Sequence, residues 1–489
     1  MSWHSARVPG TVVTRSEKTL RESPHPPHRV AGAQVTSTIG TMSDSTGAGA
    51  AHPDACPGAL RPHHAVDGAV VRIRLPGGRI SAGGLRTLTD ASCRWGDGRL
   101  DVTARGNLQL RGLDPGVLGR LAEVLRSAQL LPSVAHERVR NIVASPLSGL
   151  DSVGQVDVAP LVAEVDRRLC ADAESPALGG RFLFACDDGR GDTLALGADV
   201  TWSATGDNTG ALYVCGRDTG LRPPRDLAAP ALLTAAAEFL RLRAGDTGVW
   251  RVRDLPGGAE VLTAVLPRAL RTLPVEPVTS HRVPGTESSR PSAGPLHRDG
   301  RLTAHVVTPP LGRLTAAQAH LLAELANGEL ANGELAGTAN PAANADLIFT
   351  PWRDVVVPAP GAGAEVRLRR AGLATSANSP WQGISACVGP AGCATALAPV
   401  RRDAARLVEL RSPTGPSDTG PSDTGQRTQQ RVHWSGCSRR CGTPSETHLA
   451  VIATTPDTYE IDAAPPGITA AEAPAHVARV LENQVLENQ

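Results

Sequence analysis

Lysine is almost missing from this sequence of 489 residues, since Lys18 is its one occurrence among 49 basic side chains. Replacement of lysine by arginine fits a coding bias, because alanine and glycine are abundant as well. The chemical consequence is the same whatever the origin. A phosphate-loop lysine, a Schiff-base lysine and a lysine proton donor are excluded from the rest of the chain. Arginine remains, and its guanidinium suits the recognition of carboxylates and phosphates.

Strong net charge and long apolar runs are also missing. The net charge is +1, from 49 basic and 48 acidic side chains, which argues against a nucleic acid or a membrane surface as partner. No apolar run reaches the roughly 18–20 residues of a membrane helix, and the N-terminus lacks the apolar region of a signal peptide. We therefore expect a cytoplasmic protein with reduced thiols.

A nucleotide-binding fingerprint is the third absence. Gly77 and Gly78 fit a hairpin turn, and no Rossmann or flavin signature follows them. If the protein carries out redox chemistry, we expect its electrons to come from a separate donor.

The order of motifs indicates an internal duplication. Gly78-Arg79-Ile80-Ser81 is matched by Gly312-Arg313-Leu314-Thr315, each between a predicted strand and a predicted helix. We name the repeated pieces A, B, A′ and B′, and a duplication of this size predicts a pseudo-two-fold molecule with a site between the halves. The predicted segments are a disordered extension at 1–53 with a possible start at Met42, A at 54–125, B at 130–255, a linker at 280–297, A′ at 298–362, B′ at 365–465 and a C-terminal helix or tail at 466–489.

Two predicted strands in segment A carry arginines on their polar faces. The run at 70–75 alternates so that Arg72 lies opposite the apolar side chains, and Ser81 is a suitable cap for the following helix. The run at 99–111 places Arg105, Asn107 and Gln109 on one face. Such arginines either bind an anionic ligand or form a solvated strand face.

Cysteine is unevenly distributed. Four of nine cysteines lie in one window, while the other five are scattered singly; the four are Cys387, Cys393, Cys437 and Cys441. Four thiolates are the usual ligands of a [4Fe–4S] cluster. A structural zinc site is an alternative, although its ligand pairs are typically spaced by two to four residues, and only the second pair fits. Free cysteines without metal are the third possibility.

The cysteine spacing, C-x5-C followed by G-C-x3-C, resembles the cluster motif of the nitrite/sulfite reductase superfamily, as does the A-B-A′-B′ order. VRIRLPGG around Arg72 and T-x-R-x-N-x-Q at Thr103–Gln109 are also similar to that superfamily. In detail, CPGALRP, RGNLQLRGL, RNIVASPLSG and HWSGCSRRCG resemble the precorrin-3B synthase family of aerobic cobalamin biosynthesis. The resemblance covers roughly residues 54–460.

The resemblance implies a fold, cofactors and a substrate. The implied fold is mixed α/β (α+β), with two ferredoxin-reductase-like half modules and two cluster-domain modules around a pseudo-two-fold axis. The four cysteines would bind a [4Fe–4S] cluster, with an additional mononuclear iron or sirohaem left open. The family hydroxylates precorrin-3A with O₂ and closes a lactone. Residues implied to bind this tetrapyrrole are Arg72, Arg105, Asn107, Gln109, Arg140 and Arg181.

One departure bears on the reaction. Sulfite reductases carry two lysines spaced Lys-x-Lys, and the matching residues here are Arg181 and Leu183. This argues for another reaction on the same scaffold. The alternatives are a sirohaem-dependent nitrite or sulfite reductase and a zinc-stabilised, non-enzymatic tetrapyrrole-binding protein.

Overall fold

The computed structural model describes residues 56–246, 248–271, 276–277, 290–327, 346–412, 431–444, 446–462 and 464–487. All of them lie in one structural unit, Ala51–Gln489. The predicted disordered extension at 1–53, and most of the predicted linker at 280–297, lie outside the described residues.

The first half domain (His63–Ser127) is a five-stranded antiparallel sheet with two helices. Ser81 caps helix α1 (Ala82–Trp95) as predicted, because its hydroxyl accepts the N–H of Gly84 at 3.1 Å. The apolar side of this helix, including Leu85 and Leu88, is buried. Helix α2 spans Leu118–Ser127, and the strand order is β1 (His63–Ala65), β2 (Gly68–Ile73), β5 (Leu108–Leu113), β4 (Arg99–Val102) and β15 (Arg313–Thr315).

The predicted single strand at 99–111 is wrong, because the structure divides it into the β4–β5 hairpin. The Thr103 hydroxyl accepts the N–H groups of Arg105 at 3.3 Å and Asn107 at 3.1 Å, which closes the turn. Gly106 has φ +67°, and a Cβ there would lie 2.3 Å from the carbonyl oxygen of Phe349. Arg105 therefore projects from a turn and not from a strand face.

The second half domain (Gly294–Arg370) repeats this architecture. Helices α6 (Ala316–Ala326) and α7 (Ala364–Arg370) accompany its sheet. Its strand order is β13 (Gly294–Arg298), β14 (Arg301–Val307), β17 (Val355–Pro358), β16 (Leu347–Phe349) and β3 (Arg79–Ile80). Residues 294–297, predicted as linker, thus belong to an edge strand of this sheet.

The two half domains exchange one short strand each. β3 follows the first half domain's Pro76–Gly78 turn but pairs with β16, while β15 follows the matching turn of the second half domain and pairs with β4. Helices α1 and α6 pack together, and one hydrophobic core contains residues of both half domains. Neither half domain therefore completes its sheet from its own segment.

The two core modules share a second topology. In each, three parallel strands are followed by two antiparallel ones. The first core module (Ile142–Ala269) contains β6 (Ile142–Ala144), β7 (Phe184–Asp187), β8 (Val200–Ala204), β9 (Gly210–Val214), β10 (Arg217–Asp218), α3 (Ala159–Ala171), α4 (Ala228–Leu242) and α5 (Gly258–Ala269). The second (Ile384–Glu487) contains β18 (Ile384–Ala386), β19 (Arg431–Ser435), β20 (His448–Ala453), β21 (Thr458–Ile461), β22 (Ile468–Thr469), α8 (Val400–Arg411) and α9 (Ala473–Glu487).

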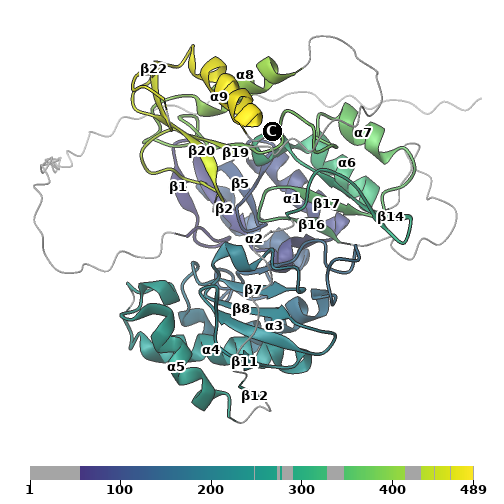
Figure 1. Cartoon of the computed structure of the whole chain (residues 1–489), viewed down its shortest axis with the longest axis vertical. Helices are drawn as coiled ribbons and strands as arrows, with labels where there is room; N and C mark the ends of the chain where they lie inside the picture. The colour runs from purple at the N-terminus through teal and green to yellow at the C-terminus, as the bar shows by residue number, and fades with distance from the viewer. Residues whose placement is uncertain are drawn as a thin grey trace, which may run out of the picture. The chain divides into compact units, whose positions relative to one another are not determined.

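Matching topologies in both pairs of modules give the mixed α/β, duplicated fold that was predicted. Figure 1 shows the teal elements β7, β8, α3 and α4 grouped together, and the yellow-green elements β20, α8 and α9 likewise. The remaining described strand pair joins β11 (Leu221–Arg222) to β12 (Glu276–Pro277). Among the described residues, no helix combines the length and apolarity needed to cross a membrane.

Candidate functional site

The four cysteines of the predicted cluster motif line one cavity of about 150 Å³. Cys387 follows strand β18 and Cys437 lies just beyond strand β19, which is its parallel neighbour. The carboxyl ends of parallel neighbours meet at one edge of the sheet, so the topology brings the two cysteine pairs together. Cys387 and Gly436 are 49 residues apart in the sequence. In the structure the Gly436 N–H donates a hydrogen bond of 3.1 Å to the Cys387 sulfur.

The four thiols interact through a shared hydroxyl group and through electrostatic effects on their pKa values. The Thr395 hydroxyl lies 3.2 Å from the Cys393 sulfur and 3.8 Å from the Cys437 sulfur. Its hydrogen bond lowers the pKa of Cys393. Burial raises the pKa of Cys441, and the three other thiols add to that effect. Four thiols that influence each other in this way are suited to a shared cationic centre, which would stabilise the thiolate forms.

The five-residue spacing of the first cysteine pair is less suited to a single zinc ion. Four thiolates bound to zinc at about 2.3 Å bring their sulfur atoms within about 4 Å of one another. Among the described residues, no group of three His, Cys, Asp or Glu side chains is arranged to hold one metal ion. The cysteines instead surround a cavity, as a multi-iron cluster requires.

Basic side chains from other segments hold the cysteine loops. Arg111 of β5 donates to the Gly392 carbonyl at 2.9 Å and forms a bidentate pair with Asp67 at 2.9 and 3.0 Å. Arg401 of α8 donates to the Cys387 carbonyl at 3.1 Å. The first half domain and helix α8 therefore fix the loop that carries the first cysteine pair.

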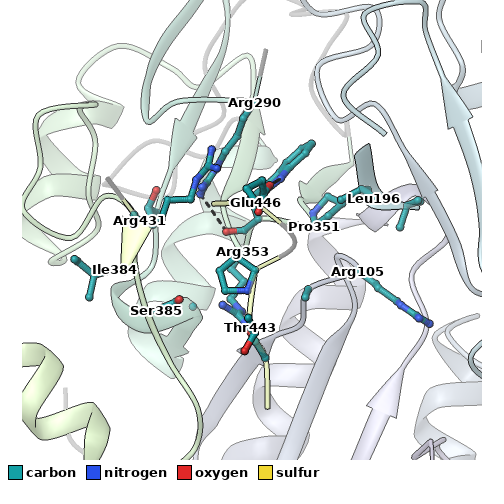
Figure 2. A pocket seen from close by; sticks show the side chains of 18 of the residues that line it. Arg105, Leu196, Arg290, Pro351, Arg353, Ile384, Ser385, Arg431, Thr443 and Glu446 are labelled. Carbon is teal, nitrogen blue, oxygen red and sulfur yellow. Dashed lines mark hydrogen bonds between the residues drawn. The ribbon is translucent and has the colours of Figure 1, made fainter. Parts of the chain in front are cut away.

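A second pocket lies between the halves of the duplicated fold, as the duplication predicts. All four modules contribute to it, and its charged lining residues are five arginines and one carboxylate: Arg105, Arg251, Arg290, Arg353, Arg431 and Glu446. Figure 2 shows Arg290, Arg353 and Arg431 on one side of the pocket and Arg105 on the other.

Electrostatic repulsion among these arginines favours an anionic ligand. Burial, with the neighbouring charges of Arg251 and Arg72, lowers the pKa of Arg105 to about 10. Burial, Arg401 and Arg290 lower the pKa of Arg353. A carboxylate bound between such guanidinium groups would relieve both the desolvation and the repulsion.

The wall between the cysteine cavity and the arginine pocket is formed by consecutive residues. Cys441 lines the cavity and Gly442 lines the pocket. The Arg353 guanidinium donates to the Gly442 carbonyl at 2.8 Å, and His433 Nε2 lies 3.2 Å from the Cys441 carbonyl. Burial and the charge of Arg353 lower the pKa of His433 to about 3, so this imidazole is neutral at pH 7 and donates through Nε2–H. A centre bound at Cys441 would therefore lie next to the pocket.

The predicted substrate arginines have different surroundings in the structure. Arg105 lines the pocket. Arg72 does not line it, but its charge contributes to the lowered pKa of Arg105. Arg140 instead forms a bidentate pair with Asp166 of α3, with both distances 2.7 Å. Arg181 is exposed, with its guanidinium 4.4 Å from the centre of the Trp250 ring. Neither Arg140 nor Arg181 lines the pocket, so their substrate-binding roles stay predictions.

The two predicted polar residues of the β4–β5 hairpin support the backbone. The Asn107 side-chain oxygen accepts the N–H of Leu75 at 2.8 Å, and Asn107 is buried. Gln109 is half-buried in β5, in register with Arg72 of β2 and Asp101 of β4. Asn107 therefore fixes the turn that presents Arg105.

Sequence reasoning missed four pocket arginines, and the duplication carried a signal for one of them. The turn at Thr350–Asp354 repeats the turn at Thr103–Asn107, since Thr350 accepts the N–H of Trp352 at 3.2 Å and of Asp354 at 3.1 Å. Arg353 occupies the Gly106 position with φ +70°. A bulky residue at a left-handed position is uncommon and marks a functional candidate. The other three, Arg251, Arg290 and Arg431, had no local signal.

The first core module has no cysteine pair at the equivalent position. Ser145 and Asp188 replace Cys387 and Gly436, with the Asp188 N–H donating to the Ser145 hydroxyl at 3.1 Å. Arg190 fills the site with bonds of 2.8 Å to both Asp188 and Asp151. Buried ion pairs thus occupy the place that the thiols have in the second module.

Comparison with known proteins finds a family model that is similar to the first half domain. Residues 61–128 match the nitrite/sulfite reductase ferredoxin-like half domain. Over 402 residues the chain is 27% identical to a precorrin-3B synthase from Sinorhizobium sp, which covers 81% of this chain and 80% of that protein.

Two further proteins are similar to part of this chain or to its fold. A ferredoxin–nitrite reductase from Leptolyngbya laminosa is 34% identical over 111 residues, or 22% of this chain and 21% of that enzyme. The structure of Mycobacterium tuberculosis NirA protein has a TM-score of 0.64 at 18% identity and covers 85% of this chain and 81% of that chain. The predicted resemblance to the nitrite/sulfite reductase superfamily and to precorrin-3B synthase is confirmed, and so is the fold.

Proposed function

We propose that this protein is a precorrin-3B synthase, which hydroxylates precorrin-3A at a meso carbon with O₂ and closes a lactone from an acetate side chain in cobalamin biosynthesis. Similarity to a precorrin-3B synthase over four-fifths of both chains supports the proposal. The structural observation that carries it is the shared wall at Cys441–Gly442, between a four-cysteine cavity and an arginine pocket.

The cysteine cavity has the ligands that a [4Fe–4S] cluster needs. Cys387, Cys393, Cys437 and Cys441 would each supply one thiolate, and the Gly436 N–H would donate a hydrogen bond to the sulfur of Cys387. The cluster would supply one-electron transfer from a separate donor to the pocket. The protein's own contribution is to hold the loops with Arg111 and Arg401.

The arginine pocket fits a substrate with several carboxylates. Arginine binds carboxylates in bidentate geometry, and two groups of arginines on opposite sides would fix a macrocycle at more than one point of its rim. Arg105 would bind on one side, with Arg290, Arg353 and Arg431 on the other. Held in this way, one meso carbon would be oriented toward the wall at Cys441.

The sirohaem reductase is the alternative on the same scaffold. The nitrite reductase relative matches only 22% of this chain, against 81% for the precorrin-3B synthase. Arginine and leucine at 181 and 183 also replace the lysine pair of sulfite reductases. Both observations favour the oxygenase, and the five-residue spacing of the first cysteine pair disfavours the zinc-binding alternative.

The first test is the cofactor content of the full chain purified without oxygen. Iron and acid-labile sulfide are quantified, and an acidified solvent extract is examined for sirohaem absorption. Four irons and four sulfides per chain without sirohaem would support the proposal. Extracted sirohaem would replace it by an anion reductase, and zinc without sulfide would exclude both enzymes.

The second test is conversion of precorrin-3A. The reaction balances as substrate plus O₂, two electrons and two protons, giving the hydroxylated product and one water. With a reductant and ¹⁸O₂, the product is expected to gain one labelled oxygen. A reduced cluster with bound precorrin-3A but no labelled product would overturn the proposed function.

A further inference from the structure

The proposed reaction consumes two protons for each O₂, because one oxygen atom leaves as water. These protons must reach the reacting oxygen in the pocket. An enzyme usually supplies them from a side chain that exchanges protons with solvent and that lies within reach of the reacting atoms.

Few side chains of the pocket can do this. Lysine is missing, and within the described part of the chain no histidine lines the pocket. Five of the charged lining residues are arginines, and a guanidinium is a poor source of exchanging protons in proteins; burial lowers the pKa of Arg105 only to about 10. His433 lies behind the wall and does not line the pocket, and its Nε2 is 3.2 Å from the Cys441 carbonyl. Among the described lining residues, Glu446 is the one carboxyl group.

Contacts fix the Glu446 carboxyl at the pocket. Trp352, at the turn of the second half domain, donates its indole N–H to Glu446 Oε1. The Glu446 carbonyl lies 2.8 Å from Nδ1 of His448, the first residue of β20. The side chain is thus held by one module and the backbone by another, which fixes the position of the carboxyl.

The charged groups around the carboxyl come from several elements. Arg431 of β19 and Glu446 act on each other electrostatically. Arg290 lies on the same side of the pocket and forms an ion pair of 3.3 Å with Asp354 of the Trp352 turn. Glu446 itself is half-buried and lines the pocket, and the next residue, Thr447, is exposed.

We propose that Glu446 is the proton-transfer residue of the pocket. The carboxyl takes a proton from solvent and gives it to the oxygen atom that leaves as water, while the two electrons come from the external donor. Trp352 is then a positioning residue, since it acts through Glu446. The proposal rests on the proposed function, because it assigns the proton supply of that reaction.

The test compares Glu446→Gln with wild type in the full chain. The amide keeps the size of the side chain but cannot transfer a proton, so kcat is expected to fall about 100-fold or more. Cluster content and the Kd for precorrin-3A are expected to stay unchanged. Glu446→Asp should restore part of kcat, and Trp352→Phe should lower kcat less than Glu446→Gln. Glu409→Gln, the same change on the exposed face of α8, is the matched control.

The outcomes of this comparison separate the role of Glu446 from the proposed function. Loss of kcat with unchanged substrate affinity, together with a changed pH profile of kcat, supports the role of Glu446. Glu446→Gln with wild-type kcat overturns it while the proposed function stands. A higher Kd with unchanged kcat makes Glu446 a binding residue and also overturns it. A wild-type protein that binds precorrin-3A and does not oxidise it overturns both proposals.

Discussion

At the residue scale, Cys441 has the position on which the proposed chemistry depends most. It is the most solvent-accessible of the four cavity cysteines and the one next to the arginine pocket. Its thiol is coupled electrostatically to the other three. A cluster bound there would be connected to the substrate through one residue.

Cys441→Ser is therefore expected to abolish the electron paramagnetic resonance signal of a reduced [4Fe–4S] cluster. The serine oxygen is a poor replacement for a thiolate ligand of iron. Iron and sulfide content are measured on the same sample. Cys93→Ser, at an exposed cysteine of α1, should leave the signal as in wild type. An unchanged signal in Cys441→Ser would remove this residue from the ligand set.

Arg105→Ala is expected to weaken binding of the tetrapyrrole without loss of the cluster. A hydrogen bond to a charged group contributes about 1.5–3 kcal/mol, which is about tenfold or more in Kd. Affinity is measured by titration under anaerobic conditions. Arg268→Ala, at an exposed arginine of α5, serves as the control. Equal affinity in both variants would exclude Arg105 from the substrate site.

Arg140→Ala is expected to change stability and not affinity. Loss of the partly buried pair with Asp166 should lower the free energy of unfolding by about 1.5–3 kcal/mol. Urea unfolding followed by circular dichroism measures this change. A fall in tetrapyrrole affinity with unchanged stability would instead support the substrate role that the sequence predicts.

At the scale of single elements, the exchanged strands depend on glycine turns. Gly78 has φ +72°, and a Cβ there would lie 1.9 Å from the Phe349 carbonyl oxygen of β16. Only glycine lets the two backbones approach so closely at the start of β3. The turn therefore determines whether β3 can reach the other half domain.

Gly78→Ala is expected to destabilise the fold far more than Gly98→Ala. Gly98 has nearly the same φ, +71°, but no atom within 4 Å of the added Cβ, so its substitution costs about 1 kcal/mol of backbone strain. The Tm of each variant is measured by thermal unfolding. Because both positions carry the same backbone strain, the difference between the two shifts in Tm reports the close contact at Gly78. Equal shifts in Tm would show that the contact with β16 is unimportant.

At the scale of the whole molecule, strand exchange makes the two halves interdependent. β3 completes the sheet of the second half domain and β15 completes that of the first. Arg313 of β15 adds an ion pair of 3.0 Å with Asp101 of β4. A half expressed alone would leave an unpaired strand edge and an open apolar core, which favours aggregation.

Residues 54–271 expressed alone are therefore expected to be insoluble, and co-expression with residues 290–489 is expected to give a soluble complex. Size-exclusion chromatography and circular dichroism measure the outcome. A monomeric 54–271 fragment with a cooperative unfolding transition would contradict the interdependence of the halves.

Several features of this protein could be predicted from local sequence pattern. The apolar periodicity after Ser81 predicted α1, and the repeated Gly-Arg motifs predicted the duplication. The spacing of four cysteines predicted that Cys387, Cys393, Cys437 and Cys441 share one site, and they line one cavity. Helical periodicity and the spacing within each cysteine pair are readable in one segment because they involve residues close together in the sequence.

The contacts between distant segments depend on the fold and were not predicted. β3 and β15 pair across the halves, and Arg140 meets Asp166 where the sequence predicts a substrate carboxylate. Arg353 and Glu446 enter the pocket from different modules. A guanidinium binds whichever carboxylate, carbonyl or ring the fold brings to it, so the partner of an arginine depends on long-range packing that no local pattern contains.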